Sequence, residues 1–194
     1  MKSKSKLHIT NGKEEDIEVI SKLLYKTEDY PEDEWGRGKR DELLVRLKKL
    51  MKRGGTRFYY DNFRVLKLDK EIIGIALSIE GKKLKKKTFL ADLFVIRMQK
   101  SLKEKIRFVF LTLIYLLDFE CFFNEYYLSN IIIKEEFRGK GYSEILIGDV
   151  LDTAKEKGYL KVSLRANNEK LVKFYERLGF KRVNSKSKKL IKKI

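Results

Sequence analysis

The order of apolar and polar positions along the chain predicts alternating strands and helices. Runs rich in β-branched and aromatic residues predict strands at 7–10, 58–69, 71–80, 127–133 and 159–165. Apolar residues spaced three and four apart predict helices at 17–24, 43–50, 103–117, 145–154 and 171–178. The segments 180–184 and 189–194 predict a final hairpin. The pattern therefore indicates a mixed α/β protein.

The segment between the strand at 127–133 and the helix at 145–154 is suited to binding phosphate. Gly139 and Gly141 allow a tight turn with no side chain in the way. N–H groups at the start of the next helix then point to one place, supported by the helix dipole and by the charges of Arg138 and Lys140. The spacing fits neither the Walker loop nor the three-glycine dinucleotide fingerprint. We expect a pyrophosphate site of another type.

Two motifs resemble those of the GNAT N-acetyltransferase superfamily. The run Arg138-Gly139-Lys140-Gly141-Tyr142-Ser143 is similar to its acyl-CoA signature, Arg/Gln-x-x-Gly-x-Gly/Ala, with serine in the last small position. A second segment is similar to Asn-x-x-Ala-x-x-Phe-Tyr-x-x-x-Gly-Phe, with Leu171 in place of the usual alanine. It is matched by Asn168, Phe174, Tyr175, Gly179 and Phe180. The resemblance extends from about residue 126 to 183.

This resemblance implies an α+β fold with a central, mostly antiparallel twisted sheet flanked by helices, and an N-acyltransferase that uses acetyl-CoA. Residues 82–123 then form an insertion, helical around 103–117, before the central strand. The lysine-rich run 82–87 is expected in a solvated loop or at a helix end. The implied cofactor-binding residues are Ile131, Ile132, Ile133, Arg138, Gly139, Lys140, Gly141, Tyr142, Ser143, Asn168, Phe174 and Tyr175.

The resemblance also implies a catalytic role for Tyr175, as the general acid beside the thiol. The family position that often carries a basic carboxylate falls near Tyr127, which is not an acid. Glu125, Ser129 or an acid from 28–34 is then expected to relay the proton through water. The chain has no Cys–His or Ser–His–Asp set, which favours direct transfer in a ternary complex over a covalent intermediate. We expect no metal.

The acceptor is expected to be a primary amine of a small molecule or a protein. Acids and aromatic rings cluster between the first two predicted helices, and both attract cationic amines. These residues are Glu28, Asp29, Tyr30, Glu32, Asp33, Glu34 and Trp35. The alternative is that the acids cap the second helix or lie in solvent. The apolar stretch 106–123 is expected to pack in the core or to form a homodimer contact rather than to bind substrate.

Composition predicts one soluble domain covering residues 1–194. With 43% hydrophobic residues the chain can bury a substantial core, and Cys121 as its only cysteine suggests the reducing cytoplasm. No apolar run is long enough to span a membrane. The formal net charge of +17 is interpreted as a solvated surface that also attracts coenzyme A, with no dedicated nucleic-acid site. Two alternatives stay open: an acyl-CoA-binding module without turnover, and a basic ribosome- or nucleic-acid-associated protein.

Overall fold

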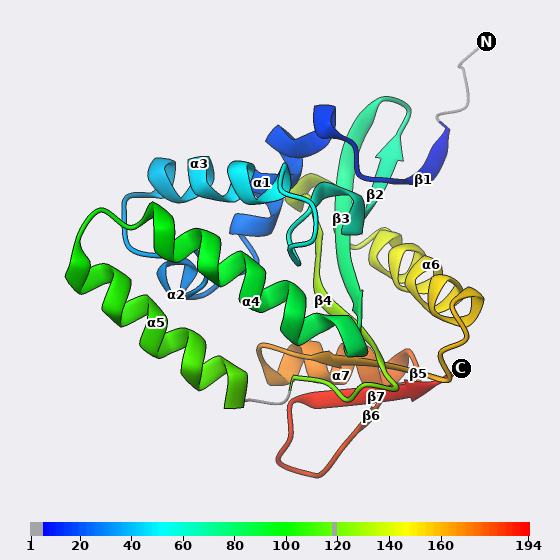
Figure 1. Ribbon diagram of the computed structural model, residues 1–194. Helices are drawn as coiled ribbons and strands as arrows, with labels where there is room; N and C mark the ends of the chain where they lie inside the picture. Colours follow the sequence, from blue (N-terminus) through cyan, green and yellow to red (C-terminus); the bar gives the residue numbers. More distant parts are fainter. Residues whose placement is uncertain (1–5, 118–119) are drawn as a thin grey trace.

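An open β-sheet forms the centre of the computed structural model, which describes residues 6–117 and 120–194 (Figure 1). Within these residues seven strands pair in the order β1-β2-β3-β4-β5-β7-β6. Neighbouring strands are antiparallel except β4 and β5, which are parallel. This confirms the mostly antiparallel α+β fold. The strands are β1 Leu7–Asn11, β2 Phe63–Leu68, β3 Glu71–Glu80, β4 Tyr126–Ile133, β5 Lys161–Arg165, β6 Lys181–Arg182 and β7 Lys189–Lys193.

Helices cover both faces of this sheet (Figure 1). Helices α1 to α5 pack on one face, and α6 and α7 pack on the other. Successive side chains of β4 alternate between the two cores, with Tyr127 in the first and Tyr126 and Leu128 in the second. The helices are α1 Ile17–Tyr25, α2 Pro31–Trp35, α3 Arg40–Met51, α4 Gly81–Met98, α5 Leu102–Leu117, α6 Tyr142–Glu156 and α7 Glu169–Arg177.

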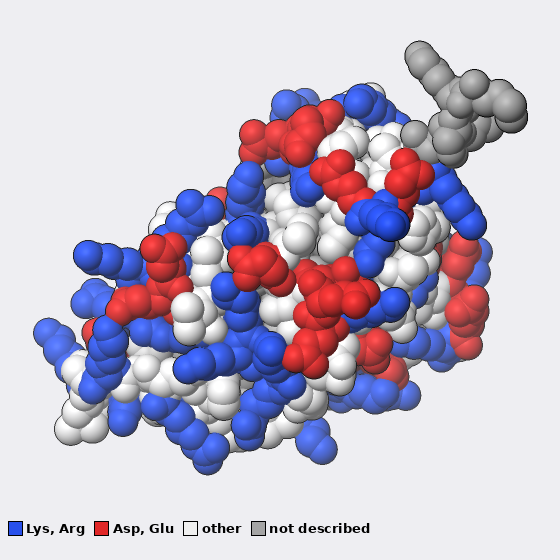
Figure 2. Space-filling view, turned by 90° about the horizontal axis from the view of Figure 1, so that it is seen from above, with Lys and Arg blue, Asp and Glu red and all other residues white. Residues whose placement is uncertain are grey.

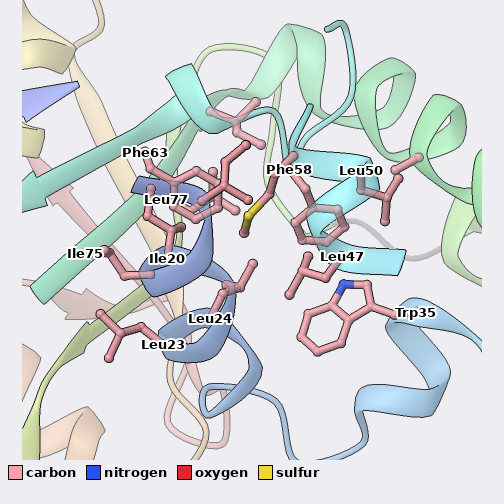
Figure 3. Packing of buried hydrophobic residues seen from close by; sticks show 14 of the residues in the cluster. Ile20, Leu23, Leu24, Trp35, Leu47, Leu50, Phe58, Phe63, Ile75 and Leu77 are labelled. Carbon is pink, nitrogen blue, oxygen red and sulfur yellow. The ribbon is translucent and has the colours of Figure 1, made fainter. Parts of the chain in front are cut away.

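Trp35 anchors the short acidic helix α2 in the first core (Figure 3). Its indole is fully buried, and its ring centre lies 5.7 Å from that of Tyr25 and 6.2 Å from that of Phe58. A guanidinium N–H of Arg46, on α3, donates to the Trp35 carbonyl oxygen over 3.0 Å. These contacts fix the position of the acids that precede Trp35.

The segment 58–62, expected to begin a strand, forms a turn instead. The chain makes a 3-10 turn at Tyr60–Asn62, and β2 starts at Phe63. The Asn62 amide donates to the carbonyl oxygens of Thr56 and Arg57, both over 3.0 Å, and so holds the chain in the turn. Local hydrogen bonds of an asparagine side chain commonly replace strand pairing in this way.

The insertion contains two antiparallel helices rather than one (green, Figure 1). The lysine run 82–87 lies in the first turns of α4, not in a loop. The helix can start there because Gly81 has no Cβ: one would stand 2.1 Å from the Phe122 carbonyl oxygen. Of the described residues of α5, only Phe108 and Thr112 are buried. Most of this apolar helix therefore does not pack in the core, which was one of the two roles expected from its sequence.

Candidate functional site

A cleft opens where β4 and β5 stop pairing. The two strands pair over 126–128 of β4, and no further pair joins them in the described part of the chain. Next to this point β4 has a bulge. Leu77 and Ser78 of β3 pair with Asn130 and Leu128, so Ser129 between them has no partner on β3. Bulges bend a strand and redirect its side chains. Beyond the bulge, the edge of β4 that faced β5 borders the cleft.

The glycine turn lies at one end of this cleft. Gly139 and Gly141 have φ angles of +75° and +79°, in the left-handed region that glycine adopts without steric cost. Helix α6 begins directly after Gly141, so its first N–H groups have no partner within the helix. The turn therefore has the backbone shape expected of an anion site.

A cavity of about 300 Å³ joins the glycine turn to β4 and α7. Arg138 reaches back to β4, where its Nε donates to the Ile133 carbonyl oxygen over 3.1 Å. The cavity brings together most of the residues expected to bind the cofactor. Its lining is Ile131, Ile132, Ile133, Phe137, Arg138, Gly139, Tyr142, Ser143, Leu171, Phe174 and Tyr175.

Three of the expected cofactor residues lie beside this cavity and do not line it. Gly141 is the N-cap residue of α6. The Lys140 side chain is exposed, and its ammonium lies 3.4 Å from the Glu136 carbonyl oxygen. Asn168 caps α7, since its side-chain oxygen accepts a 3.0 Å hydrogen bond from the Leu171 N–H.

Tyr175 stands where the cofactor end of the cleft meets the middle. Its side chain is buried on α7 and packs edge-on against Phe174 and Phe180. Burial raises the pKa of its hydroxyl to about 12. Tyr175 therefore keeps its proton at neutral pH and remains a hydrogen-bond donor.

Two further cavities continue the cleft beyond Tyr175. A middle cavity of about 240 Å³ shares Ile131, Ile132, Arg138, Leu171 and Tyr175 with the first. A larger one, of about 540 Å³, shares Thr27, Asp29, Ser129, Asn130, Arg165, Ala166 and Asn167 with the middle cavity. The three cavities are thus neighbours along one cleft, which runs from the glycine turn to the loop before α2.

Acidic side chains line the large cavity, which we call the acidic chamber. The carboxylates are Glu28, Asp29, Asp33, Glu34 and Glu120, and the rings of Tyr30, Tyr115 and Tyr127 lie among them. Glu28 accepts a 2.8 Å hydrogen bond from the Asn130 amide, which ties the loop to the bulged part of β4. The acid–aromatic cluster expected near the acceptor thus lies at the cleft, with two exceptions: Glu32 is exposed, and Trp35 is buried in the first core.

Glu34 is the most perturbed acid of the chamber. Burial raises the pKa of its carboxyl to about 7, and the negative charges of Glu28, Glu120 and Asp92 add to this, against the opposing effect of Arg57. Burial likewise raises the pKa of Asp92, deeper between α4 and α5, to about 6. Among the described residues no hydrogen bond or ion pair holds the Glu34 carboxylate, although both acids lie near Arg57.

Arg57 connects the acids to the bulge of β4. One of its terminal nitrogens donates to the Ser129 hydroxyl over 2.7 Å, and the other lies 3.5 Å from the Glu120 carboxylate. The Ser129 hydroxyl in turn donates to Asn130 over 2.7 Å. The Arg57 side chain is almost fully buried, and its Nε has no partner in the described residues. A buried cation among acids limits their mutual repulsion.

The two other expected catalytic residues have different surroundings. Tyr127 lines the acidic chamber and hydrogen-bonds to Glu120; burial and the Glu120 charge raise its pKa well above the usual value. Glu125 lies outside all three cavities. Its carboxylate lies 3.0 Å from the Lys189 ammonium and accepts the Phe122 N–H. The structure therefore does not place Glu125 at the acidic chamber.

The sequence pattern misses several residues of the chamber. Arg57, Tyr115, Glu120 and Arg165 come from a turn, the insertion and the end of β5, far apart in the chain. No motif marks them, because only the packing of the insertion against α2 and β4 brings them together. No group of three or more side chains suited to hold a metal occurs in residues 6–117 and 120–194.

Comparisons with known proteins agree with this fold. A family model described as acetyltransferase (GNAT) family matches residues 22–180. An N-acetyltransferase from Staphylococcus aureus Mu50 has a similar structure, with a TM-score of 0.74 and 23% identity over 95% of this chain and 99% of that one. Another acetyltransferase structure gives a TM-score of 0.68 and 20% identity over 96% and 99%.

A third similar structure contains a bound cofactor. The paia N-acetyltransferase from Thermoplasma acidophilum, in complex with coenzyme A, has a TM-score of 0.56 and 15% identity over 97% of this chain and 99% of that one. At these identities the structural likeness concerns the fold alone. No curated protein sequence matches the chain.

Proposed function

Since the chain belongs to the acetyltransferase (GNAT) family, we propose that it transfers acetyl from acetyl-CoA to the primary amine of a cationic acceptor. The observation that carries this proposal is the single cleft that joins the glycine turn to the acidic chamber. One end suits an anionic cofactor and the other a positively charged amine. Tyr175 lines the middle cavity of this cleft, and Glu34 lines the acidic chamber.

The first cavity fits acetyl-CoA, which supplies the acetyl group as a thioester. The N–H groups of the glycine turn and the start of α6 are suited to the pyrophosphate. Gly139 leaves room there, because no heavy atom lies within 4 Å of the place where a Cβ would stand. Backbone groups of 131–133 that β3 does not use would hold the pantetheine arm. One N–H of this strand would polarise the thioester carbonyl.

Glu34 is the proposed general base. A group with a pKa of about 7 is ionised in about half of the molecules at neutral pH and can accept a proton without binding it too tightly. It would take the proton of the ammonium directly or through one water. This assigns the role to the 28–34 segment among the alternatives that the sequence leaves open, ahead of Ser129 and the ion-paired Glu125.

Tyr175 is the proposed general acid. The amine nitrogen bonds to the acetyl carbon, the carbon–sulfur bond breaks, and the Tyr175 hydroxyl gives its proton to the departing thiolate. The nitrogen then gives its second proton to water, and Tyr175 regains a proton from water, which leaves the neutral amide and the free thiol. A hydroxyl with a pKa of about 12 is still protonated at neutral pH and can therefore give its proton to the thiolate. Tyr127, whose pKa is also raised, would help to orient Glu120 toward the acceptor rather than exchange a proton itself.

The acidic chamber supports a cationic acceptor. Five carboxylates line the cavity against three cations, Arg57, Arg165 and Lys188, so its lining keeps a net negative formal charge. An ammonium group would recover attraction from several of them, whereas an anionic acceptor would be repelled. The acid–aromatic composition of the wall also favours cations over neutral amines of the same size.

Turnover is favoured over acyl-CoA binding alone. The sequence keeps the binding-only alternative open because Tyr127 stands where a carboxylate is expected. Glu34 and Glu120 border the same cavity as Tyr127, so carboxylates are present although the strand supplies none. We further propose that residues 1–194 form one domain and that the enzyme acts in the cytoplasm.

Thermal shift and thiol release test this function together. Acetyl-CoA at about 100 times its dissociation constant should raise Tm by about 5–10 °C, with ATP and NAD as phosphate controls. Addition of an alkyl diamine should then release free thiol. An equal shift with all three nucleotides, or a shift without thiol release from any cationic amine, would overturn the proposal.

A further inference from the structure

Helix α5 turns a continuous apolar stripe toward solvent. Its buried residues, Phe108 and Thr112, are one turn apart and face the core. The opposite side carries large apolar side chains that are 54% to 80% exposed, at spacings of three and four residues. They are Leu102, Ile106, Phe110, Leu113 and Leu117. An exposed stripe of this length marks an interaction surface, because an isolated soluble helix normally exposes polar residues there.

The apolar surface continues past the end of α5. Phe122 and Phe123 are both more than half exposed. They line a small groove between the start of α4 and the end of α5, together with Phe89 and Leu116. The stripe and these exposed aromatic residues belong to the same helical hairpin, and together we call them the hairpin face.

The hairpin that carries this face is strongly basic. Residues 81–117 contain ten Lys and Arg but two Asp and Glu, which gives almost half of the chain's net charge of +17. One of the two acids, Asp92, is turned inward toward Arg57 and Thr112. Lys82 and Lys83 share the single carboxylate of Glu80. On the face that Figure 2 shows, Lys and Arg are widely spread, and clusters of Asp and Glu lie among them.

Several cations of the hairpin have no acidic partner and lie next to the apolar side chains. In the described part of the chain no carboxylate forms an ion pair with Lys86, Lys103 or Lys105. Lys103 precedes Ile106 by three residues, and Lys86 precedes Phe89 by three, so each cation shares a helix side with exposed apolar residues. The face therefore combines apolar groups with unneutralised positive charge.

The apolar groups and the unneutralised charge of the hairpin face favour an anionic surface over a second copy of the chain as its binding partner. In a two-fold dimer the same surface meets itself, so the lysines around the stripe would face the lysines of the partner. A lipid surface with anionic headgroups accepts both features, because the aromatic and aliphatic groups enter the headgroup boundary while the lysines contact phosphate. None of the helices in residues 6–117 and 120–194 is long and apolar enough to cross a bilayer.

We propose that the hairpin face binds the surface of an anionic membrane, with α5 lying in the plane of the headgroups. This inference does not depend on the acetyl transfer proposed above, and its test does not use enzyme activity. Arg107 of α5 lies 2.5 Å from Asp33 at the acidic chamber, so the membrane-bound face would adjoin the entrance for the acceptor.

Sedimentation with lipid vesicles tests the proposal on the full chain. Vesicles with equal amounts of phosphatidylcholine and phosphatidylglycerol should bind the protein at least tenfold more strongly than phosphatidylcholine alone, and high salt should remove most of the difference. Equal binding to both vesicle types, or none to either, would overturn the proposal without any variant.

Two variants separate the apolar from the charged contribution. Phe110→Ser with Leu113→Ser should lower binding to anionic vesicles at least tenfold. Lys86→Gln, Lys103→Gln and Lys105→Gln together should lower it about 100-fold, at about fivefold for each charge. Controls outside the hairpin, Leu160→Ser and the pair Lys170→Gln and Lys173→Gln, should retain binding. All eight target and control residues are exposed except Lys105, which is half-exposed.

The competing occupants give distinct results. Undiminished vesicle binding by the Phe110 and Leu113 variant would reduce the effect to charge alone and overturn the role of the stripe. A dimer in sedimentation equilibrium that this variant converts to monomer, with no vesicle binding by the unaltered chain, would assign the face to a second copy. Thermal unfolding of each variant confirms that the comparison is between folded proteins.

Discussion

At the scale of single residues, the proposed chemistry rests on side chains whose proton affinity is set by burial. Tyr175 lines the first and middle cavities and Glu34 lines the acidic chamber, and burial raises the pKa of both. The effect is useful in opposite ways. It brings the Glu34 carboxylate into the range of a base at neutral pH and keeps the proton on Tyr175.

Glu34→Gln should lower kcat by about 10²–10⁴-fold, because the amide cannot accept the proton. In the unaltered enzyme kcat/KM should fall as pH decreases through about 7, since Glu34 is then protonated and no longer a base. The variant should lose this dependence. Steady-state rates from pH 5 to 9 check it, with Glu32→Gln, on the exposed side of the same helix, as control. An unchanged pH profile in Glu34→Gln would assign the base elsewhere.

Tyr175→Phe should lower kcat by about 10²-fold or more while the KM for acetyl-CoA stays within about twofold, because the hydroxyl acts mainly in the transition state. Tyr142→Phe is the matched control, since it lines the same cavity from α6. Thiol release at saturating acceptor measures both. Equal losses in the two variants would mean that the cavity wall, and not the Tyr175 proton, was affected.

At the scale of elements, the turn before α6 and the anchor of α2 position the two ends of the cleft. The turn depends on local backbone geometry, which its glycines make visible in the sequence. Helix α2 has only five residues and depends on Trp35 for its place. The Arg46 bond also holds the end of the helix, while Asn130 holds Glu28 and Arg107 holds Asp33.

Gly141→Glu should abolish binding of coenzyme A in calorimetry. The side chain would bring a negative charge to the anion site, and a non-glycine residue at φ +79° costs about 1–2 kcal/mol. Gly148→Ala is the control, because Gly148 lies inside α6 with open space around it, and alanine should stabilise the helix by about 0.5–1 kcal/mol. Retained affinity in Gly141→Glu would refute the site.

Trp35→Ala should destabilise the protein by about 3–5 kcal/mol, since it empties the centre of the first core. It should also raise the KM for the amine more than that for acetyl-CoA, because α2 supports the acidic chamber and not the glycine turn. Urea unfolding and two-substrate kinetics measure these effects. A decrease of less than about 1 kcal/mol in the free energy of unfolding would mean that other contacts hold α2.

The packing of the insertion was the least predictable at this scale. Its apolar content and lysine run could be read from the sequence, but not the division into α4 and α5. Gly81 looks like an ordinary loop residue, and its role becomes visible only beside the carbonyl groups of Phe122 and Glu125. Similarly, the turn at 60–62 depends on the hydrogen bonds of Asn62.

At the scale of the whole molecule, charge is unevenly distributed. The chain carries a net +17, yet five carboxylates face one cavity. In the proposed reaction, the strongly basic surface would attract the anionic cofactor over long range, while the acidic chamber would attract the cationic acceptor at short range. The two substrates would therefore differ in charge as well as in binding place.

Raising NaCl from about 0.05 M to about 0.5 M should lower kcat/KM for acetyl-CoA severalfold, because the Debye length falls from well over 10 Å to a few Å. Initial rates at saturating amine measure this. The kcat/KM for the amine should change much less, since the acidic chamber would bind its ammonium in close contact. Equal sensitivity for both substrates would show that the net charge does not assist the cofactor.

The sequence by itself determined the glycine turn and the order of the strands and helices, apart from α2 and α4, which no pattern predicted. The turn and the predicted elements depend on residues close together in the chain, so that apolar spacing and the two glycines were sufficient to predict them. Only the tertiary structure decided the acidic chamber. Glu34, Arg57 and Glu120 belong to distant segments, and the proton affinity of Glu34 arises from burial and neighbouring charges that exist only once those segments pack.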